Sequence, residues 1–244
     1  MRVGIFLPLV AAIGAVLFHP SLEAAHGVSQ PRLLARPKDG DFHSQANQDE
    51  FVHMLLYGLL DKQDKGCYLE IGAGEPVYTN NSYFFEKRLQ WGGVSIDIST
   101  NLGVRWRAAR TNLLLIEDAT KSDYSAILSS FPKVIDYLSL DIDEKYDAVL
   151  EKLFCADHVF KIITIEHDAY RYGDFYRQKE RRILSGLGYC LLCADVSSFE
   201  DWWVHPSFFP AAALSTLTSL DLNSKKSEEI IQKIKSAIRT IKTS

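Results

Sequence analysis

The sequence predicts an α/β fold in which helices cover both faces of a mostly parallel β-sheet. Short apolar runs alternate with helical patterns along most of the chain, which is typical of strands joined by helical crossovers. Glycine and acidic residues follow these runs, at the strand ends where such sheets bind ligands. The length of 244 residues suits one domain of ordinary size with extensions.

Six apolar runs predict strands, and they have the four to eight residues typical of strands rather than helices. They lie at 67–71, 94–98, 113–116, 135–141, 160–166 and 189–196. Helical patterns fill the intervals at 82–89, 102–110, 122–130, 145–154 and 174–187. A last strand around Trp202 and Trp203 would direct these two side chains to opposite faces of the sheet.

The composition excludes several classes of protein. Hydrophobic residues make up 47% of the chain and charged residues 24%, which rules out a disordered or collagen-like chain. Lys and Arg number 27 against 31 Asp and Glu, so the formal net charge is −4. This mild acidity provides no broad positive surface, and we therefore predict no nucleic-acid partner.

Residues 1–25 are predicted to be a signal peptide or a signal anchor. Arg2 precedes an uncharged run over 3–18, and small residues follow near Ala24 and Ala25, in the pattern of a secretory signal. The run is short for a bilayer span, which needs about 20 residues. Cleaved signal and uncleaved anchor stay open as alternatives, as does a buried helix. The first two predict the secretory pathway or attachment to a membrane through this segment.

The remaining boundaries follow from composition and periodicity. Residues 26–42 contain prolines and glycines without an apolar period and are predicted to be a linker. The main domain is expected at 43–222. Residues 223–244 predict a basic amphipathic helix with isoleucines at helical spacing. This helix either packs its isoleucines on the domain, which we favour, or lies on anionic lipid.

The four cysteines predict neither a disulfide framework nor a zinc site. Cys190 and Cys193 are three residues apart in a predicted strand, so their side chains should point to opposite faces. No second cysteine pair or histidine pair completes a set of zinc ligands. We therefore expect buried thiols, and no metal.

Three successive strand ends suit a nucleoside. Gly72 and Gly74 after the first strand allow a tight turn and a close approach of a ligand to the backbone. Asp97 ends the second strand, at about the spacing expected for an acid that binds a ribose diol. Asp118 and Ala119 follow the third strand, where a carboxylate can accept a hydrogen bond from an adenine amino group.

A dinucleotide site is not predicted at the same place. Val77 stands where a dinucleotide-binding turn needs its third glycine. Glu75 would also repel a pyrophosphate. The pattern therefore favours a nucleoside without phosphates over NAD or a nucleotide sugar.

The segment Glu70-Ile71-Gly72-Ala73-Gly74 resembles motif I of class I S-adenosylmethionine-dependent methyltransferases. Further segments over 43–206 resemble the FkbM-type branch of that superfamily: Ser44 to Asp49, Asn80-Asn81-Ser82 with Glu86, Trp91 to Asp97, Leu138 to Asp143, and Phe199 to Pro206. The resemblance implies a Rossmann-like methyltransferase fold with a seven-stranded sheet, and S-adenosylmethionine as cofactor. It implies that the turn containing Glu70, Gly72, Ala73 and Gly74 holds the methionine part. Asp97 would then bind the ribose, and Asp118 with Ala119 the adenine.

Ionisable residues gather at the ends of the fourth and fifth predicted strands: Asp141, Asp143, Glu166, His167 and Asp168. We predict Asp141, His167 and Asp168 as catalytic residues, one of them a general base that deprotonates an attacking hydroxyl. Mg²⁺ held by the carboxylates is possible but not favoured. Capping of the following helices by Asp143 and Asp174 is the other alternative.

The sequence therefore predicts a methyltransferase, FkbM-like, that methylates a hydroxyl of a small molecule or carbohydrate. A mixture of aromatic and arginine side chains is expected to line the acceptor cleft: Tyr170, Arg171, Tyr172, Tyr176, Arg177, Trp202 and Trp203. The alternative is a catalytically degenerate scaffold, tethered to a membrane and binding a protein. It predicts loss of the cofactor residues, which are present here.

Overall fold

The computed structural model describes residues 40–243. The signal segment predicted at 1–25 and most of the linker predicted at 26–42 lie outside this range. Phe42 at the end of that linker packs against Phe84, with ring centroids 4.6 Å apart, so it belongs to the domain. Within 40–243, no helix is both long enough and apolar enough to cross a membrane.

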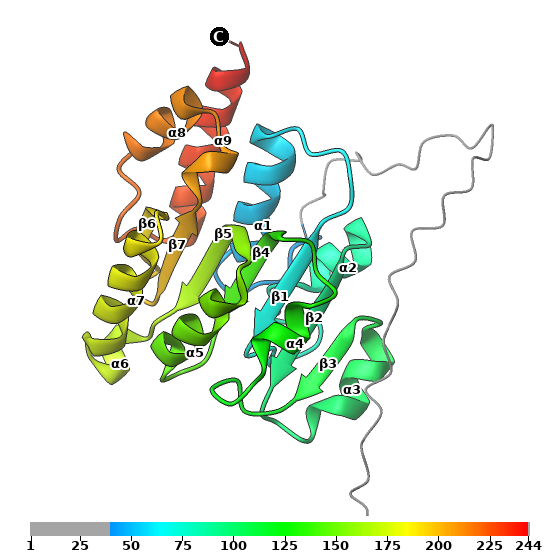
Figure 1. The fold of residues 1–244 in the computed structure, drawn as a ribbon. Coiled ribbons are helices and arrows are strands. Elements are labelled where there is room, and N and C mark those ends of the chain that lie inside the picture. Colours follow the sequence, from blue (N-terminus) through cyan, green and yellow to red (C-terminus); the bar gives the residue numbers. More distant parts are fainter. Residues whose placement is uncertain (1–39, 244) are drawn as a thin grey trace, which may run out of the picture. The chain divides into compact units, whose positions relative to one another are not determined.

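Seven strands form one sheet in the order β3-β2-β1-β4-β5-β7-β6 (Figure 1). The strands are β1 (Cys67–Ile71), β2 (Gly92–Asp97), β3 (Leu113–Ile116), β4 (Val134–Leu140), β5 (Val159–Glu166), β6 (Cys190–Val196) and β7 (Glu200–Val204). Neighbours among β1 to β5 are parallel, whereas β7 is antiparallel to both β5 and β6. This topology confirms the predicted Rossmann-like methyltransferase fold.

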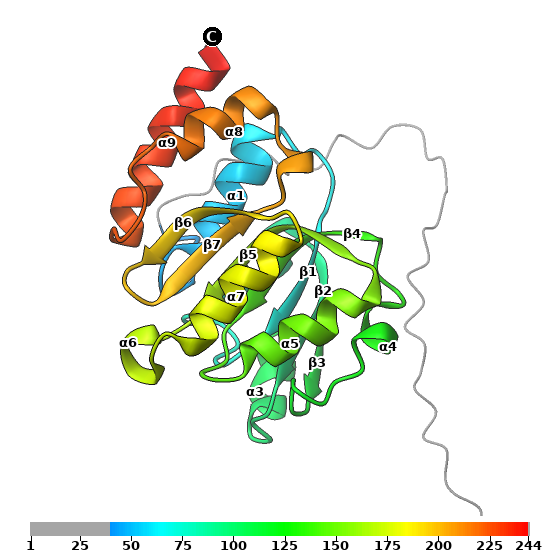
Figure 2. The same cartoon turned by 60° about the vertical axis from the view of Figure 1, so that its left-hand side comes forward.

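Helices cover both faces of the sheet (Figures 1 and 2). On one face lie α1 (Gln48–His53), α2 (Tyr83–Leu89), α3 (Leu102–Ala109), α8 (Ala211–Thr218) and α9 (Ser227–Thr243). On the other lie α4 (Tyr124–Leu128), α5 (Tyr146–Leu153) and α7 (Phe175–Gly186). The short α6 (Ala169–Tyr172) follows β5, and a π-helical segment, η1 (Met54–Leu59), continues α1. The helices α1, α6 and α8 were not predicted from the sequence.

The two faces of the sheet bury separate apolar clusters. Trp202 and Trp203 on β7 show the division, because Trp202 packs in the cluster under α1 and α9 and Trp203 in the cluster under α5 and α7. Both side chains are fully buried. Their predicted opposite orientation is therefore right, but their predicted place in an acceptor cleft is wrong, because they are core residues.

The C-terminal helix α9 is part of the domain core. Ile230, Ile231, Ile234 and Ile238 are buried in the same cluster as α1 and η1. Ser227 donates a 2.8 Å hydrogen bond to the Asn47 side chain, and Lys242 forms an ion pair with Asp61. The isoleucines thus pack on the domain, as favoured above. They are not available to lie on lipid.

The bulge in β6 changes the expected placement of the two cysteines. Leu191 pairs with Trp203 and Cys193 with Trp202, so β6 carries one extra residue between them. An extra residue shifts the alternation of side chains by one position. Cys190 and Cys193 therefore both pack against the cluster under α1 and α9, instead of pointing to opposite faces.

Candidate functional site

A cavity of about 530 Å³ opens at the carboxyl ends of β1, β2, β3 and β4. The parallel strands bring together six of the ten predicted site residues as its lining: Gly72, Gly74, Asp97, Asp118, Ala119 and Asp141. Asp143 belongs to the acidic cluster predicted at the ends of the fourth and fifth strands. The remaining lining residues were not predicted as part of the site: Ile96, Ile98, Glu117, Thr120, Ile142, Glu144 and Lys145. Glu70, Ala73, His167 and Asp168 do not line the cavity.

The turn after β1 is held against the neighbouring strands. Gly72 has a φ of 84° and its amide donates a 2.8 Å hydrogen bond to the Ile96 carbonyl of β2. A Cβ on Gly72 would lie 1.7 Å from the Asp141 carbonyl oxygen at the end of β4. Only glycine fits both this φ and this close approach. Gly74 also has a positive φ, of 55°, but space around it is open.

Asp97 is fixed by backbone amides at both carboxylate oxygens. Oδ2 accepts a 2.9 Å hydrogen bond from the Gly74 amide, and Oδ1 accepts a 2.7 Å bond from the Ser99 amide. Each oxygen retains a further lone pair for a ligand. The carboxylate is therefore oriented to accept two donors, such as the vicinal hydroxyls of a ribose.

Asp118 is an ionised acceptor on the β3 side of the cavity. Its hydrogen bonds from the Thr120 hydroxyl (2.7 Å) and amide (3.0 Å), together with the nearby Lys121, lower its pKa to about 2. Next to it, the Ala119 carbonyl accepts a 2.9 Å hydrogen bond from the Tyr124 hydroxyl. This pair has the chemistry expected for the edge of an adenine.

Glu70 and Ala73 support the glycine turn from behind. Glu70 is buried and accepts a 2.6 Å hydrogen bond from the Ser95 hydroxyl; burial raises its pKa, opposed by the charge of Arg110. The Ala73 carbonyl accepts a 3.0 Å hydrogen bond from the Asn80 side chain. Glu70 and Ala73 therefore position the glycine turn.

Arg110, at the C-terminal end of α3, donates hydrogen bonds to the segment that follows the glycine turn. Its guanidinium is fully buried and donates to the Glu86 carboxylate at 2.6 Å and to the Ser82 hydroxyl at 2.7 Å. It also donates to the Asn80 and Tyr68 side chains and to the Pro76 carbonyl. The segment 80–86 that carries part of the FkbM resemblance therefore folds around one arginine, which the sequence analysis missed.

We expect Asn80 to stay unmodified, although Asn80-Asn81-Ser82 is a formal glycosylation sequon. The Asn80 side chain is 1% exposed, and its amide nitrogen donates to Ala73. A glycan on that nitrogen could not fit in this buried position. Peptide mapping before and after glycosidase treatment, with the chain produced in a eukaryotic host, checks this. A glycan at Asn80 would contradict the described position of the turn.

The lining of the cavity is acidic. Lys145 is the single cationic side chain among its lining residues, against six carboxylates: Asp97, Glu117, Asp118, Asp141, Asp143 and Glu144. Such an excess of one sign attracts ligands of the opposite charge. The cavity therefore favours a cationic nucleoside over a phosphorylated one.

Three carboxyl groups with raised pKa values meet at the carboxyl ends of β4 and β5 and at the start of the antiparallel strand β7. Burial raises the pKa of Asp141 to about 7, and the charges of Glu200 and Glu70 add to this. Burial is the main cause that raises the pKa of Glu166 to about 8, and the charge of Asp141 adds to it. Burial also raises the pKa of Glu200 to about 8. This group holds protons near neutral pH, and of its members only Asp141 lines the cavity.

The Glu200 side chain is held by hydrogen bonds, one of them from a residue 152 positions away in the sequence. Glu166 and Glu200 are cross-strand partners on β5 and β7. The Glu200 carboxylate accepts hydrogen bonds from the Trp202 indole, at 2.6 Å, and from the Gln48 side chain on α1. Two adjacent acids, Glu200 and Asp201, at the start of a strand that continues with Trp202 and Trp203 were the signal that could have identified Glu200 from the sequence.

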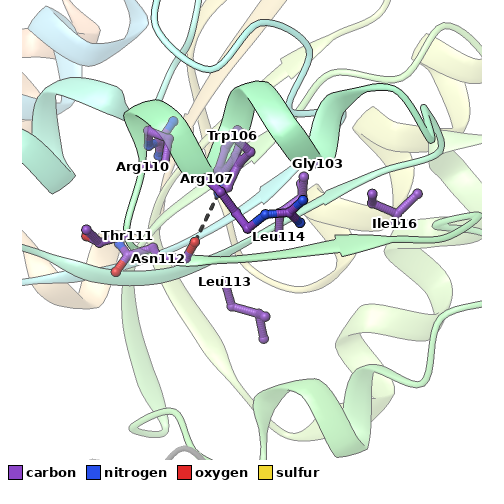
Figure 3. Close-up of a pocket in the computed structure, with 9 residues that line it drawn as sticks. All are labelled: Gly103, Trp106, Arg107, Arg110, Thr111, Asn112, Leu113, Leu114 and Ile116. Carbon is purple, nitrogen blue, oxygen red and sulfur yellow. Dashed lines mark hydrogen bonds between the residues drawn. The ribbon is translucent and has the colours of Figure 1, made fainter.

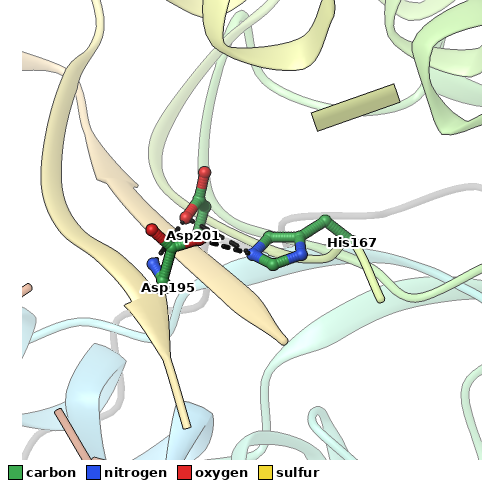
Figure 4. Close-up of side chains that lie close together, drawn as sticks. All are labelled: His167, Asp195 and Asp201. Atoms are coloured by element: carbon green, nitrogen blue, oxygen red, sulfur yellow. Dashed lines mark hydrogen bonds and ion pairs between the residues drawn. The ribbon is translucent and has the colours of Figure 1, made fainter. Parts of the chain in front are cut away.

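His167 lies away from the cavity, which corrects the expected position of this residue. Its ring is fully buried, with Nε2 3.4 Å from Asp195 and 3.7 Å from Asp201 (Figure 4). Its Nδ1 accepts a 3.1 Å hydrogen bond from the Ala169 amide. Burial lowers the pKa of His167. The structure therefore does not support it as a base at the methyl group.

The capping alternative for the carboxylates is not supported. Asp168 precedes α6 and Asp174 precedes α7, yet neither side chain makes a cap hydrogen bond. Lys145, not Asp143, occupies the N-cap of α5. Asp168 is 5% exposed and its Oδ1 has no hydrogen-bond partner within the described residues.

Within residues 40–243, one group of side chains is close enough to share a metal ion: His167, Asp195 and Asp201, with ligand atoms within 4.8 Å of one another. Arg181 pairs with both oxygens of Asp201, at 2.6 and 2.8 Å, and Arg177 and Arg181 both pair with Asp195. The arginines already neutralise these carboxylates. We therefore assign no metal to this group.

A second hollow, of about 290 Å³, lies between α3 and the edge strand β3 (Figure 3). Trp106 donates a 3.0 Å hydrogen bond to the Asn112 carbonyl, and the partly exposed side chains of Leu113 and Ile116 also line the hollow. None of the predicted site residues lines it, and it contains no carboxylate. The predicted chemistry thus belongs to the cavity at the strand ends.

Comparisons with known proteins add the following. No protein-family model and no curated protein sequence matches this chain. Among solved structures, a chain of a fibrillarin/Nop5p complex is similar at 13% identity and a TM-score of 0.43, over 58% of this chain and 72% of that one. A precorrin-6y C5,15-methyltransferase from Geobacter metallireducens is similar at 15% identity and a TM-score of 0.40, over 63% and 80%. A putative hemolysin from Streptococcus thermophilus is similar at 11% identity and a TM-score of 0.41, over 82% and 77%. These likenesses concern the fold alone.

Proposed function

We propose that this protein is an S-adenosylmethionine-dependent methyltransferase, of the FkbM-like kind, that methylates a hydroxyl of a small molecule or carbohydrate. The observation that carries the proposal is the pairing of the glycine turn with Asp97, whose two oxygens are fixed by backbone amides and open to the cavity. The acidic lining suits the sulfonium and ammonium charges of this cofactor. The same lining opposes a pyrophosphate, so NAD and nucleotide sugars are disfavoured.

The residues of this chain would divide the work as follows. The turn at Gly72 and Gly74 receives the methionine part, Asp97 the ribose hydroxyls, and Asp118 with Ala119 the adenine. The cofactor supplies an activated methyl group whose sulfur leaves as a neutral thioether. Asp141 borders the cavity beyond the turn and takes the proton of the attacking hydroxyl. Most of the rate is expected from holding the acceptor in line with the methyl group.

A degenerate scaffold that binds a protein remains the second candidate, but no observation favours it. A scaffold has no need for the oriented carboxylate of Asp97. Attachment to a membrane or entry into the secretory pathway through residues 1–25 is likewise a proposal. It rests on Arg2, the uncharged run over 3–18 and the small residues near Ala24 and Ala25.

Calorimetric titration of the full chain with S-adenosylmethionine, S-adenosylhomocysteine and NAD tests the proposal. We expect both sulfur nucleosides to bind and NAD not to bind. Asp97→Ala should weaken binding of S-adenosylhomocysteine by about 1.5–3 kcal/mol, because an ionised acceptor for two hydroxyls is lost.

Asp157→Ala is the matched control for Asp97→Ala, because Asp157 is an exposed aspartate that, among residues 40–243, forms an ion pair with Lys133 alone and lies away from the cavity. Its affinity should equal that of the parent chain. Equal affinity of the Asp97 variant would remove the ribose assignment, and binding of NAD alone would overturn the proposed function.

A further inference from the structure

Lys145 is the single cationic side chain among the residues that line the cavity at the strand ends. It lies between β4 and α5, and its side chain is exposed. It forms no ion pair and no side-chain hydrogen bond with any residue in the range 40–243. Its ammonium group is therefore available to a ligand in the cavity.

The backbone at this position is unfavourable for a lysine. Lys145 has a φ of 64°, in the left-handed region that side chains other than Asn, Asp and His rarely adopt. It is also the N-cap residue of α5, where its side chain makes no cap hydrogen bond and its charge opposes the positive end of the helix dipole. Two local preferences are thus broken at one residue of the cavity lining, which is expected where a side chain serves a ligand rather than the fold.

The segment that carries Lys145 packs against the glycine turn. The strands β1 and β4 are parallel neighbours, so the residues that follow them leave the sheet side by side. A Cβ on Gly72 would lie 1.7 Å from the Asp141 carbonyl oxygen and 3.1 Å from the Ile142 side chain. Lys145 comes three residues after Ile142 and lines the same cavity as Gly72. It therefore borders the space next to the turn, where the methionine part of the cofactor is proposed to bind.

The methionine part of S-adenosylmethionine carries a carboxylate as well as an ammonium group. In this cavity the ligand carboxylate meets acidic side chains, and even when Asp141 is protonated five others line the space. Repulsion between like charges opposes its entry unless a cation lies beside it. An ammonium–carboxylate hydrogen bond is also about twice as strong as a neutral one. Lys145 is the side chain of the lining that can supply this bond.

We propose that Lys145 binds the carboxylate of the methionine part and makes the site selective for nucleosides that retain this carboxylate. The inference rests on the proposed function and adds to it a residue that determines specificity. A nucleoside that has lost the carboxylate but kept the amine brings only positive charge to this place. The acidic side chains attract it, whereas Lys145 repels it, so the lysine is what separates the two ligands.

Two ligands that differ by one carboxylate test the inference. They are S-adenosylhomocysteine and its decarboxylated analogue, S-adenosyl-3-thiopropylamine. The full chain is titrated with each by calorimetry at pH 7 and at constant ionic strength, because salt weakens interactions between exposed charges. We expect the parent chain to bind S-adenosylhomocysteine at least about tenfold more tightly than the analogue. A tenfold ratio corresponds to about 1.4 kcal/mol.

Lys145→Gln removes the charge and keeps a polar side chain. It should weaken the binding of S-adenosylhomocysteine at least about tenfold, yet leave the binding of the analogue unchanged or tighten it, because the repulsion between two ammonium groups is lost. General damage to the structure would weaken both. Lys145→Arg keeps a cation and should retain the preference for S-adenosylhomocysteine. Lys133→Gln is the matched control, since Lys133 is an exposed lysine outside the cavity lining, and it should change neither affinity.

Lys145→Asn separates the contribution to binding from any contribution to folding. Asparagine adopts the left-handed backbone more readily than lysine, and the substitution removes a cation from the N-terminus of α5. The variant should therefore unfold at a urea concentration equal to or above that of the parent chain. It should still bind S-adenosylhomocysteine at least about tenfold more weakly, a combination that a purely structural role of the lysine would not produce.

The outcomes are separable. If the parent chain binds S-adenosylhomocysteine and the analogue equally tightly, or if Lys145→Gln keeps the parental affinity for S-adenosylhomocysteine, the inference is overturned and the proposed function stands. An equal loss of affinity for both ligands in Lys145→Gln would also overturn it, because the lysine would then act through the structure of the site. Failure of S-adenosylhomocysteine to bind the parent chain would overturn the proposed function, and this inference with it.

Discussion

Gly72→Ala is expected to abolish the stable fold of the chain. The added Cβ would lie 1.7 Å from the Asp141 carbonyl oxygen, and backbone hydrogen bonds hold Gly72 to Ile96 and Asp141 to Ile71. The residue would also keep a φ of 84°, which alanine rarely adopts. Relief requires separation of β1 from β4 at the centre of the sheet, so we expect a loss of more than about 4 kcal/mol.

Gly74→Ala is the control for this experiment, since Gly74 has a similar positive φ of 55° but no atom within 4 Å of the added Cβ. Its cost should be limited to the conformational penalty of about 1–2 kcal/mol. Urea unfolding followed by circular dichroism measures both. A Gly72 variant that unfolds at the same urea concentration as the Gly74 variant would show that the approach of the two strands is not tight.

Asp141→Asn is expected to lower turnover by about 10²–10⁴, the usual contribution of a positioned general base. Affinity for S-adenosylhomocysteine should change by less than about tenfold, because the groups assigned to the nucleoside belong to β1, β2 and β3. The base must be ionised to accept a proton. Since the pKa of Asp141 is about 7, turnover of the parent should rise with pH through this value, and the variant should lack this rise.

Stability measurements separate this effect from loss of structure. A raised pKa means that the folded chain disfavours the ionised carboxylate, so this group lowers stability as pH rises from about 4 toward 7. The Asn variant should therefore be no less stable than the parent at pH 8. Parental turnover in a folded variant would remove Asp141 as the base. Loss of parental activity with a chelator, restored by Mg²⁺, would instead make the carboxylates metal ligands.

The part of the site that could be predicted is the part that follows from topology. In a parallel sheet the residues after successive strands meet at one edge, so Gly72, Asp97 and Asp118 could be placed together from strand assignments alone. No knowledge of packing was needed. The same reasoning located Asp141.

The misplaced residues depend on features that local patterns do not contain. His167 was grouped with Glu166 and Asp168, but neighbours on an extended chain point to opposite sides, and its ring faces Asp195 and Asp201 instead. Cys190 and Cys193 were assigned by strict alternation, which the bulge in β6 interrupts. Glu200 is completed by Gln48, and no pattern within either segment indicates a contact across 152 positions.

The packing of the first helix against the last has a consequence for how the chain folds during synthesis. Asn47 bonds Ser227, Asp61 pairs with Lys242, and η1 shares its apolar cluster with α9, so α1 and η1 gain these partners only after the last helix has been made. Contacts of such long sequence separation close late, because the intervening loop entropy opposes them. Until then Leu55 and Leu56, fully buried in the finished domain, lack part of their cover. A nascent chain stalled before Ser227 should therefore be a substrate for chaperones that recognise exposed leucines, and release of the final helix should end that binding.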